Sequence, residues 1–522
     1  MPDRTPAADV PRLGRRGLIW LVVYAIGLGA SHFFVIAPSF AYLGFEKIPP
    51  NPLVAILMVP TYLLCARRLP ASWERPSAIV YWMLFLVVVA PIHVLPVFTT
   101  DLSTPVWLMV GSVAAAFWLL GAIYSWQLPD IRRVALAPKV YWPVYGLLWL
   151  ALIGVVVSYY GLQFRLVSLS EIYEIRDTYR DSFEQVPRVS RYAITWLGNV
   201  IAPIAIARGL MSRRWGWAIL GVATELFLVS ITGFKQMLFS SVFVAGVVIL
   251  VKTTDLRRIG YRVAALVGAG VIGITAYDFF TGGWSISSIV VRRMVLTSAV
   301  NTKYHFEFFM ANPKAYLGYG LLSRWVDYPY DLSPAFLIGQ VYYGNPGTSA
   351  NANIWADAYA NFGLLGVFGF TAILGVVLIF IDSVARDVPR GLGIAALAQS
   401  AFSLSNTAML TVFLTHGMLL AVFLVYFMPS DSPVTRPPPR WRRARQSSAD
   451  PPGGLENPGG PENLGGPENP GTPGGAHANG QVPGDGGSAS TASAATNGTS
   501  AGPAATEPRP TPQGNPGSER HP

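Results

Sequence analysis

Two adjacent arginines followed by a histidine and a glutamate are the first residues that could do chemistry. They lie in VRRMVLTSAVNTKYHFEFF, residues 291–309, as Arg292, Arg293, His305 and Glu307. Neighbouring residues cannot both face one ligand on a regular helix, so one arginine would bind an anion and the other would pack or pair. His305 and Glu307 could accept a proton, since histidine titrates near neutral pH. The alternative is that His305, which has aromatic neighbours, packs at a membrane interface.

The segment SANANIWADAYANFGLLG, residues 349–366, offers amide and carboxylate groups just before an apolar run. Its polar residues are Asn351, Asn353, Asp357 and Asn361, and Tyr359 is one of its aromatic residues. Amides and acids above aromatic rings suit the hydroxyls and faces of sugars, and Asp357 is a further candidate base. The same polar residues could cap the start of a helix. Both interpretations can hold at once.

Two other segments carry isolated cations. In EIYEIRDTYR, residues 171–180, Tyr173, Arg176 and Arg180 share one helix face because they lie at i, i+3 and i+7. That face could hold a phosphate or a sugar, although an amphipathic helix on a membrane surface would look the same. In ITGFKQMLF, residues 231–239, Lys235 follows a tight turn between apolar runs. It could bind an anion or anchor a helix end at the membrane interface.

The elements that must position these residues are apolar helices. Hydrophobic residues make up 52% of the 522 residues and charged residues only 13%, and long apolar runs recur as in membrane-spanning proteins. We therefore expect an all-α, polytopic membrane protein of about 12 transmembrane helices. The expected spans are residues 17–38, 52–66, 78–98, 106–126, 142–162, 192–211, 216–233, 236–251, 263–281, 363–382, 391–409 and 411–428.

The basic residues indicate how the spans are oriented. They gather in alternate connections, for example in residues 67–75, 132–139, 252–262 and 386–390, and the positive-inside rule places those connections in the cytoplasm. The net charge of +10 is thereby explained without nucleic acid. We expect both termini to be cytoplasmic, with a basic lead at residues 1–16, a transmembrane domain at 17–428 and a disordered, Pro- and Gly-rich tail at 429–522.

Two expected outer loops, residues 163–191 and 284–362, break this charge pattern. Both contain several arginines, although basic residues are disfavoured on the outer face. A bound anion would explain them, because the guanidinium fork pairs with phosphate oxygens. Ion pairing with nearby acidic residues is the alternative for any single arginine in 163–191.

Several enzyme classes are disfavoured by missing motifs. The sequence has no Gly-rich phosphate loop, no HExxH and no GxSxG, which argues against an NTPase, a zinc protease and a serine hydrolase. The outer loops have no DxD-like motif, so we expect a metal-independent reaction without a cofactor. The single cysteine, Cys65, excludes a disulfide within the chain.

Over residues 15–430 the sequence resembles the bacterial O-antigen polymerase (Wzy) and oligosaccharide repeat unit polymerase family. The similarity is strongest in IYEIRDTYR, in the TGFKQ turn and in ANIWADAYANFGLLG. It implies a GT-C-type glycosyltransferase in the bacterial plasma membrane. Such an enzyme polymerises undecaprenyl-pyrophosphate-linked oligosaccharide units on the outer face to make a surface polysaccharide. Further partners would be membrane lipids and the flippase and chain-length regulator of the same pathway.

The resemblance also suggests roles for the candidate residues. Cations would stabilise the departing lipid pyrophosphate, and the base that activates the acceptor hydroxyl would be His305, Glu307 or Asp357. The catalytic candidates are Arg176, Arg292, His305 and Asp357. The substrate-binding candidates are Tyr173, Arg180, Lys235, Arg293, Glu307, Asn351, Asn353, Tyr359 and Asn361.

Other functions fit about twelve spans as well. An O-antigen-ligase-like enzyme would transfer a finished glycan to another acceptor, and another GT-C transferase would use a lipid-monophosphate sugar. A flippase or transporter for lipid-linked glycans would have charged residues within its spans and repeated halves. The few charges inside the expected spans favour an enzyme.

Overall fold

In a computed structural model of the chain, the residues described are 11–162, 164, 175, 179, 186–320 and 322–430. Within these residues all regular structure is helical, apart from one isolated bridge between Arg12 and Pro70. The expected all-α class is confirmed. The described residues belong to one compact unit, Met1–Pro437. Residues 1–10 of the expected lead and residues 431–522 of the expected tail lie outside the described residues.

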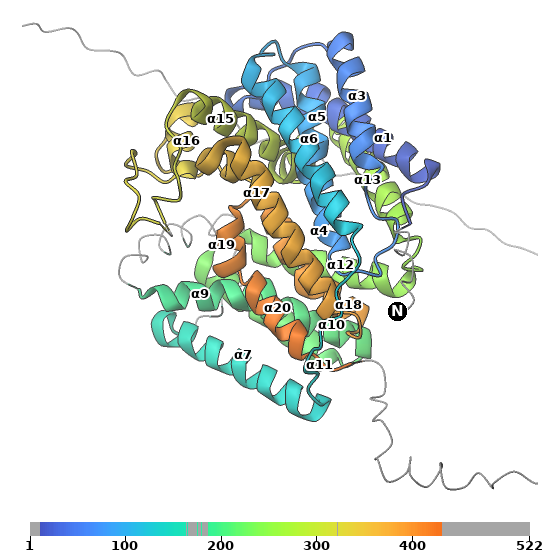
Figure 1. Cartoon of the computed structure of the whole chain (residues 1–522), viewed down its shortest axis with the longest axis vertical. Coiled ribbons are helices and arrows are strands. Elements are labelled where there is room, and N and C mark those ends of the chain that lie inside the picture. The colour runs from blue at the N-terminus through green and yellow to red at the C-terminus, as the bar shows by residue number, and fades with distance from the viewer. Residues whose placement is uncertain are drawn as a thin grey trace, which may run out of the picture. The chain divides into compact units, whose positions relative to one another are not determined.

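The helices of the first half (Figure 1) have the following bounds: α1 Arg15–Ala30, η1 Ser31–Ile36, α2 Ala37–Phe40, η2 Ala41–Leu43, α3 Pro52–Ala66, α4 Ala78–Leu84, η3 Phe85–Val89, α5 Ala90–Val94, η4 Leu95–Phe98, α6 Thr104–Tyr124, α7 Pro138–Tyr160, α9 Arg188–Trp196, η6 Leu197–Ile201 and α10 Ala202–Ser212. Those of the second half are α11 Trp215–Thr232, α12 Lys235–Thr253, α13 Ile259–Thr281, α14 Ser285–Ser287, η7 Ser288–Leu296, α15 Thr297–Ala311, α16 Pro334–Tyr343, α17 Ile354–Val384, α18 Arg390–Leu404, α19 Met409–Leu414 and α20 Met418–Phe427.

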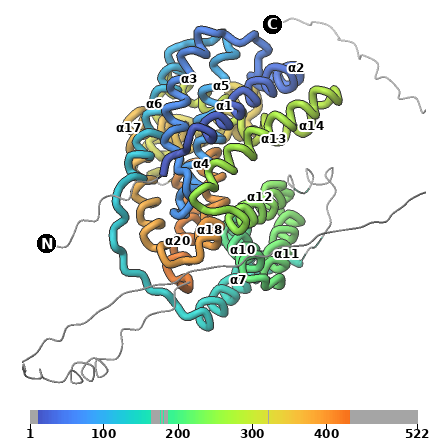
Figure 2. The backbone as a smooth tube through the Cα atoms, turned by 90° about the vertical axis from the view of Figure 1, so that its right-hand side faces the viewer, coloured from blue at the N-terminus to red at the C-terminus, as the bar shows by residue number. Residues whose placement is uncertain are grey.

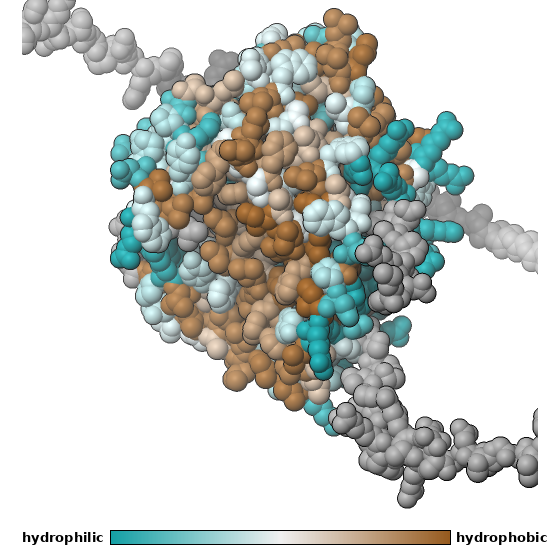
Figure 3. Space-filling view, viewed as in Figure 1, coloured by the Kyte–Doolittle hydropathy of each residue, from teal (hydrophilic) through white to brown (hydrophobic). Residues whose placement is uncertain are grey.

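Nine helical stretches in the described part of the chain are long and apolar enough to cross a membrane. Each overlaps one of the twelve expected spans. The other three expected spans are shorter helices: α3, α18, and the broken pair α19 and α20. Many apolar side chains face outward, among them Ile26, Leu57, Leu147 and Leu266. Figure 3 shows a broad hydrophobic area on the face that it draws. The chain therefore has the construction of a polytopic membrane protein.

The spans pack in pairs and bury a few polar groups between them. Helix α1 lies along α13 (Figure 2), α6 along α17, and α4 along α18. Asp382 of α17 accepts hydrogen bonds from the backbone N–H and the hydroxyl of Ser77, at 3.0 and 2.6 Å. Both groups are buried, so this contact stabilises the interior only while the carboxylate keeps its partners.

Three spans contain a π-helical turn directly before an Ala-Pro step. The turns are η1, η3 and η6, and the prolines are Pro38, Pro91 and Pro203. Proline has no N–H and its ring clashes with the carbonyl four residues earlier, and a wider turn relieves this clash. Carbonyls of two of these turns accept tyrosine hydroxyls from other spans: Tyr24 donates to Leu86 O at 2.9 Å, and Tyr145 donates to Ile201 O.

The connections rich in basic residues meet at one end of the helices, which we call the basic end (residues 11–14, 67–77, 125–137, 254–258 and 385–389). Backbone hydrogen bonds join Ala71 to Pro11 and Trp73 to Leu256. Arg386 pairs with Asp130 at 3.6 Å, and Arg257 pairs with Glu74 at 3.4 Å. The basic connections, which alternate along the sequence, thus come together on one surface of the structure.

Candidate functional site

The sequence segment 285–311 forms one continuous helical stretch, α14–η7–α15, that packs against α6 and α17. Its central turn, η7, is π-helical and carries Arg292 and Arg293. The Arg292 guanidinium donates to Ser288 Oγ at 2.9 and 3.1 Å and lies 4.2 Å from the centroid of the Phe40 ring. Burial, then the neighbouring Arg293, lower its pKa. Arg293 is exposed, so the two arginines face different surroundings.

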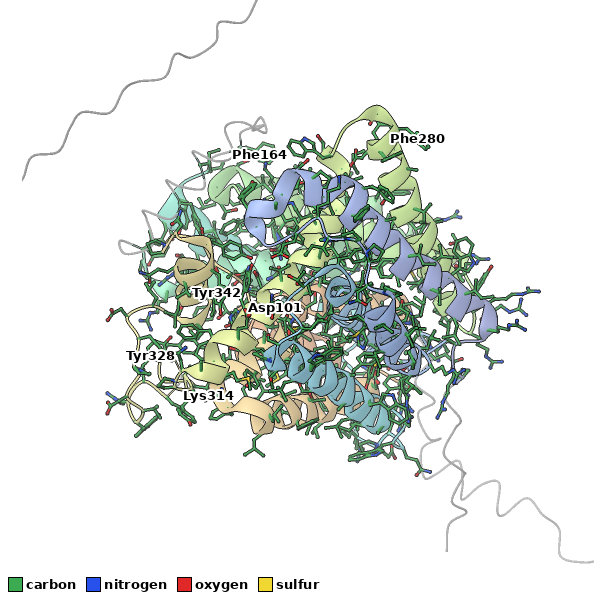
Figure 4. The ribbon with its side chains drawn as sticks, turned by 90° about the horizontal axis from the view of Figure 1, so that it is seen from above. Asp101, Phe164, Phe280, Lys314, Tyr328 and Tyr342 are labelled. Atoms are coloured by element: carbon green, nitrogen blue, oxygen red, sulfur yellow. The ribbon has the colours of Figure 1, made fainter. Side chains whose placement is uncertain are left out.

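Two turns further along, α15 contributes to an acid–lysine cluster, defined as Asp101, Lys303, Glu307 and Tyr342. Lys303 Nζ lies 2.6 Å from Asp101 Oδ2, which joins α15 to the connection between η4 and α6. Tyr342 comes from α16, and Figure 4 shows it beside Asp101. Three segments that are distant in sequence therefore meet at this cluster.

The two carboxyl groups of the cluster differ in acidity. Burial alone would raise the pKa of Asp101, but hydrogen bonds with Lys303 and Ser103 lower it to about 2. The pKa of Glu307 is raised by partial burial and by the nearby Asp101, against the opposing effect of Lys303. Two carboxyls with separated pKa values are a common arrangement for proton transfer. Of the two, Glu307 is the carboxyl whose pKa is raised.

Paired aromatic rings lie next to the cluster. Tyr304 stacks on Tyr342 with ring centroids 4.2 Å apart and an interplanar angle of 15°. Tyr343 donates to Asn301 Oδ1 at 2.8 Å. Gly44 adopts φ 84° directly against the Tyr304 hydroxyl, so any side chain at position 44 would collide with it. The acid–lysine cluster is thus bordered by stacked aromatic rings.

A cavity of about 80 Å³ lies behind Lys303 and Tyr304, lined also by His32, Glu46 and Phe98. Ligand pockets are commonly about 300–1,000 Å³, so this cavity is too small to enclose an oligosaccharide. A long glycan would have to lie along the surface of the cluster.

His305 is separated from Glu307, although the sequence suggested a pair. His305 is fully buried, and its Nδ1–H donates to Asn301 O at 2.8 Å. Its ring stacks near Phe309, and burial lowers its pKa to about 4. Nε2 has no hydrogen-bond partner among the described residues. The histidine is thus a neutral core residue, whereas Glu307 is half-buried on another face.

The polar residues at the start of α17 hold the fold together. Asn353 is the N-cap: its Oδ1 accepts from Trp355 N at 3.0 Å, and its Nδ2 donates to Thr302 Oγ1 at 2.7 Å. Asp357 Oδ1 accepts from Tyr319 at 3.1 Å and from Asn361 at 3.0 Å. Asn361 also accepts from Leu317 N at 2.8 Å. All three are buried. Asn353 serves the capping role that the sequence also allowed, whereas Asp357 and Asn361 bond to each other and to the 317–319 turn.

Tyr359 is enclosed in a similar way. Its ring stacks on Phe306 at 3.9 Å, and Lys314 Nζ lies 4.3 Å from its centroid. Asn351, by contrast, has an exposed side chain that accepts from Ser349 Oγ at 2.7 Å. It is the member of the 349–366 group that a ligand reaches without rearrangement.

Of the remaining candidates, Lys235 lies within the described residues. Tyr173, Arg176 and Arg180 are outside the described residues. Tyr179, which is described, lies 5.5 Å from Phe234 between ring centroids. Lys235 follows as the first residue of α12. The IYEIRDTYR segment and the TGFKQ turn are therefore neighbours at Tyr179.

Sequence reasoning identified Glu307 but missed Asp101, Lys303 and Tyr342 as its partners. Asp101 lies in a short connection, TTDLSTP, that gives no local signal. Within the described residues no group of three His, Cys, Asp or Glu side chains could hold a metal ion. No family model, curated protein or solved structure matches the chain.

Proposed function

We propose that this chain is a membrane glycosyltransferase that polymerises oligosaccharide units carried on a polyprenyl pyrophosphate. The acid–lysine cluster carries the proposal, because it combines a carboxyl of raised pKa with a cation and stacked tyrosines. Glu307 would accept the proton of the acceptor hydroxyl. Lys303 would stabilise negative charge that develops on the departing phosphate. The reaction so drawn needs no metal or other cofactor.

The separation of the cationic sites suggests how two substrates are held. Arg292 and Glu307 are fifteen residues apart in sequence, which is about 22 Å along a helix. A phosphate at Arg292 therefore cannot also touch the carbon that reacts beside Glu307. We assign Arg292 and Arg293 to the pyrophosphate of the acceptor, whose glycan would extend from there to the cluster.

The orientation belongs to the same proposal. The basic end would face the cytoplasm, as the positive-inside rule requires, and both termini would lie there. The cluster would then face the outside of a bacterial plasma membrane. The three shorter helical segments would complete twelve spans in a GT-C-like arrangement, with a flippase and a chain-length regulator as pathway partners.

The test uses purified full-length chain, a synthetic polyprenyl-pyrophosphate-linked repeat unit and EDTA, with glycan length read on a gel. We expect a ladder of products. Arg292→Ala should raise the KM for the acceptor about tenfold or more, the usual effect of losing a hydrogen bond to a charged group. Arg257→Ala, at an exposed arginine of the basic end, is the matched control and should leave the ladder unchanged.

Other outcomes would identify a different function. A single transfer product without a ladder would indicate a ligase-like transferase. Movement of the lipid across a vesicle bilayer without any product would indicate a flippase. A ladder that is equally strong in both arginine variants would remove Arg292 from the site.

A further inference from the structure

An apolar groove opens between α1, α3 and the α5–η4 segment. Its volume is about 470 Å³, within the range of pockets that hold small molecules. One wall includes Ile26 of α1 and Phe33 of η1, and the wall from α3 includes Ala55 and Val59. Ile26 and Val59 are more than half exposed. The groove is therefore open on a side of the bundle where membrane-spanning helices expose apolar side chains.

The aromatic side chains that line the groove contribute ring surface to it and no free hydroxyl group. Tyr62 lines it, but the Tyr62 hydroxyl donates to Leu21 O at 2.6 Å and is buried. Phe98 closes the end nearest the connection between η4 and α6. A glycan or a charged peptide would find almost nothing there to replace its lost hydrogen bonds. A hydrocarbon chain loses nothing by entering.

The end of the groove near residues 44–50 carries a cation. Lys47 is exposed, and its Nζ lies 5.9 Å from the centroid of the Phe33 ring. Phe98 lines both the groove and the small cavity that holds Glu46 and Lys303. The groove thus runs from an apolar recess toward Lys47, and the residue before it, Glu46, lines the same small cavity as Lys303.

We propose that the groove binds the hydrocarbon chain of the polyprenyl carrier, with the carrier's phosphate at Lys47. The identity of the carrier rests on the proposed function. A phosphate at Lys47 would place the first sugar of the donor toward Lys303 and Glu307. The donor and acceptor phosphates would then occupy different sites, Lys47 for the donor and Arg292 for the acceptor.

The test is photo-crosslinking of the full chain in phosphatidylcholine vesicles that contain a trace of polyprenyl phosphate with a photoreactive group on its chain. Labelled peptides are mapped by mass spectrometry. We expect labelling on α1 and α3. Ala55→Trp, which fills the groove, should reduce it about tenfold, whereas Ala151→Trp, on the exposed side of α7, should not. Lys47→Ala should weaken labelling by the phosphate but not by the matching neutral polyprenol.

Three results would overturn the proposal: labelling spread evenly over α1, α7 and α13, equal labelling of the two tryptophan variants, or equal competition by an anionic diacyl phospholipid. The last would make the groove a site for ordinary membrane lipid. Because crosslinking does not require transfer, the two proposals can fail separately. A labelled groove in a protein that makes no glycan ladder would retain the lipid site and remove the polymerase.

Discussion

At the scale of single residues, Lys303 controls the acidity of two carboxyl groups. Asp101 keeps its charge because Lys303 lies 2.6 Å away. Partial burial and the nearby charged Asp101 both disfavour the ionised form of Glu307, so the pKa of Glu307 is raised. A carboxyl of raised pKa is a stronger base than an ordinary glutamate. The cluster therefore suits the activation of a hydroxyl.

Glu307→Gln should abolish most transfer while the protein stays folded. In the parent chain, activity should rise with pH as Glu307 loses its proton, with a midpoint above the ordinary glutamate pKa of about 4.3. In the variant this rise should be absent. The measurement is kcat/KM against pH. An unchanged ascending limb in Glu307→Gln would assign the base to another residue.

Asp101→Asn tests the coupling between the two acids. The change removes a negative neighbour and frees Lys303, and both effects favour ionised Glu307. The ascending limb should therefore move to lower pH, whereas a purely structural role for Asp101 would lower activity without moving it. If Asp101→Asn lowered the maximal activity but left the midpoint of the pH profile unchanged, the pKa of Glu307 would not depend on Asp101.

The sign of the stability effect is opposite for the two groups. Glu307 has a raised pKa, so the folded state binds its proton more tightly and loses stability as pH rises through that range. Asp101 has a lowered pKa, and its stabilisation is lost as pH falls toward about 2. The Glu307→Gln variant should therefore be as stable as the parent protein at pH 7, or more stable, although it has lost its transfer activity.

At the scale of elements, the sequence predicted where α17 begins and ends better than it predicted the secondary structure of residues 285–311. The Asn-rich stretch indicated a helix start, and Asn353 is the N-cap. The sequence did not predict a long helix in the expected outer segment 284–362, where residues 285–311 are helical and pack on α6 and α17. The separation of His305 from Glu307 follows from helix geometry, since residues i and i+2 point about 200° apart. The Lys303–Asp101 pair depends on tertiary packing, which local sequence does not encode.

The NFG step near residue 362 divides α17 into two helices. Gly363 has φ 60° and ψ −145°, a conformation that other residues rarely adopt. A methyl group there would find space, its nearest neighbour being Lys314 Cε at 3.5 Å, so the cost of substitution is backbone strain. The amides of Asn353 and Asn361 lie before this break, and the apolar span lies after it.

Gly363→Ala should destabilise the protein by about 1–3 kcal/mol. The measurement is thermal unfolding in detergent, followed by the loss of monomer on size-exclusion chromatography. Gly369→Ala is the control, because Gly369 lies in regular helix with open space around it. Its melting temperature should stay the same or rise slightly, as alanine favours helix. Equal melting temperatures for the two variants would show that the break carries no strain.

At the scale of the whole membrane domain, charge sorting predicts which end faces the cytoplasm. The alternation of basic connections was visible in the sequence, and the structure joins those connections into the basic end. The number of spans was harder to predict, because α3 and α20 are apolar but short, and α18 and α19 are only 15 and 6 residues long. Burial inside the bundle allows such irregular helices at membrane depth.

Cysteine accessibility in intact cells tests this orientation. The native Cys65 is buried, so the parent chain should react little with a membrane-impermeant maleimide. Asp327→Cys, at an exposed position in the 284–362 segment, should react from outside, and Asp255→Cys, exposed at the basic end, should react only after the membrane is opened. The reverse pattern would invert the topology and with it the proposed outer location of the cluster.

The π-helical turns before Ala-Pro have a consequence for how the spans recognise one another. Lipid tails are as apolar as leucine, so apolar contact alone hardly distinguishes one neighbouring helix from another. The widened turns offer carbonyl oxygens at Leu86 and Ile201, and Tyr24 and Tyr145 each supply the hydroxyl for one of them. Two of the three π-helical turns are thus paired with a tyrosine of another span, a contact that depends on the identity of the neighbouring helix. In a bilayer, these hydrogen bonds at the π-helical turns would help to determine which helices of the bundle pack together.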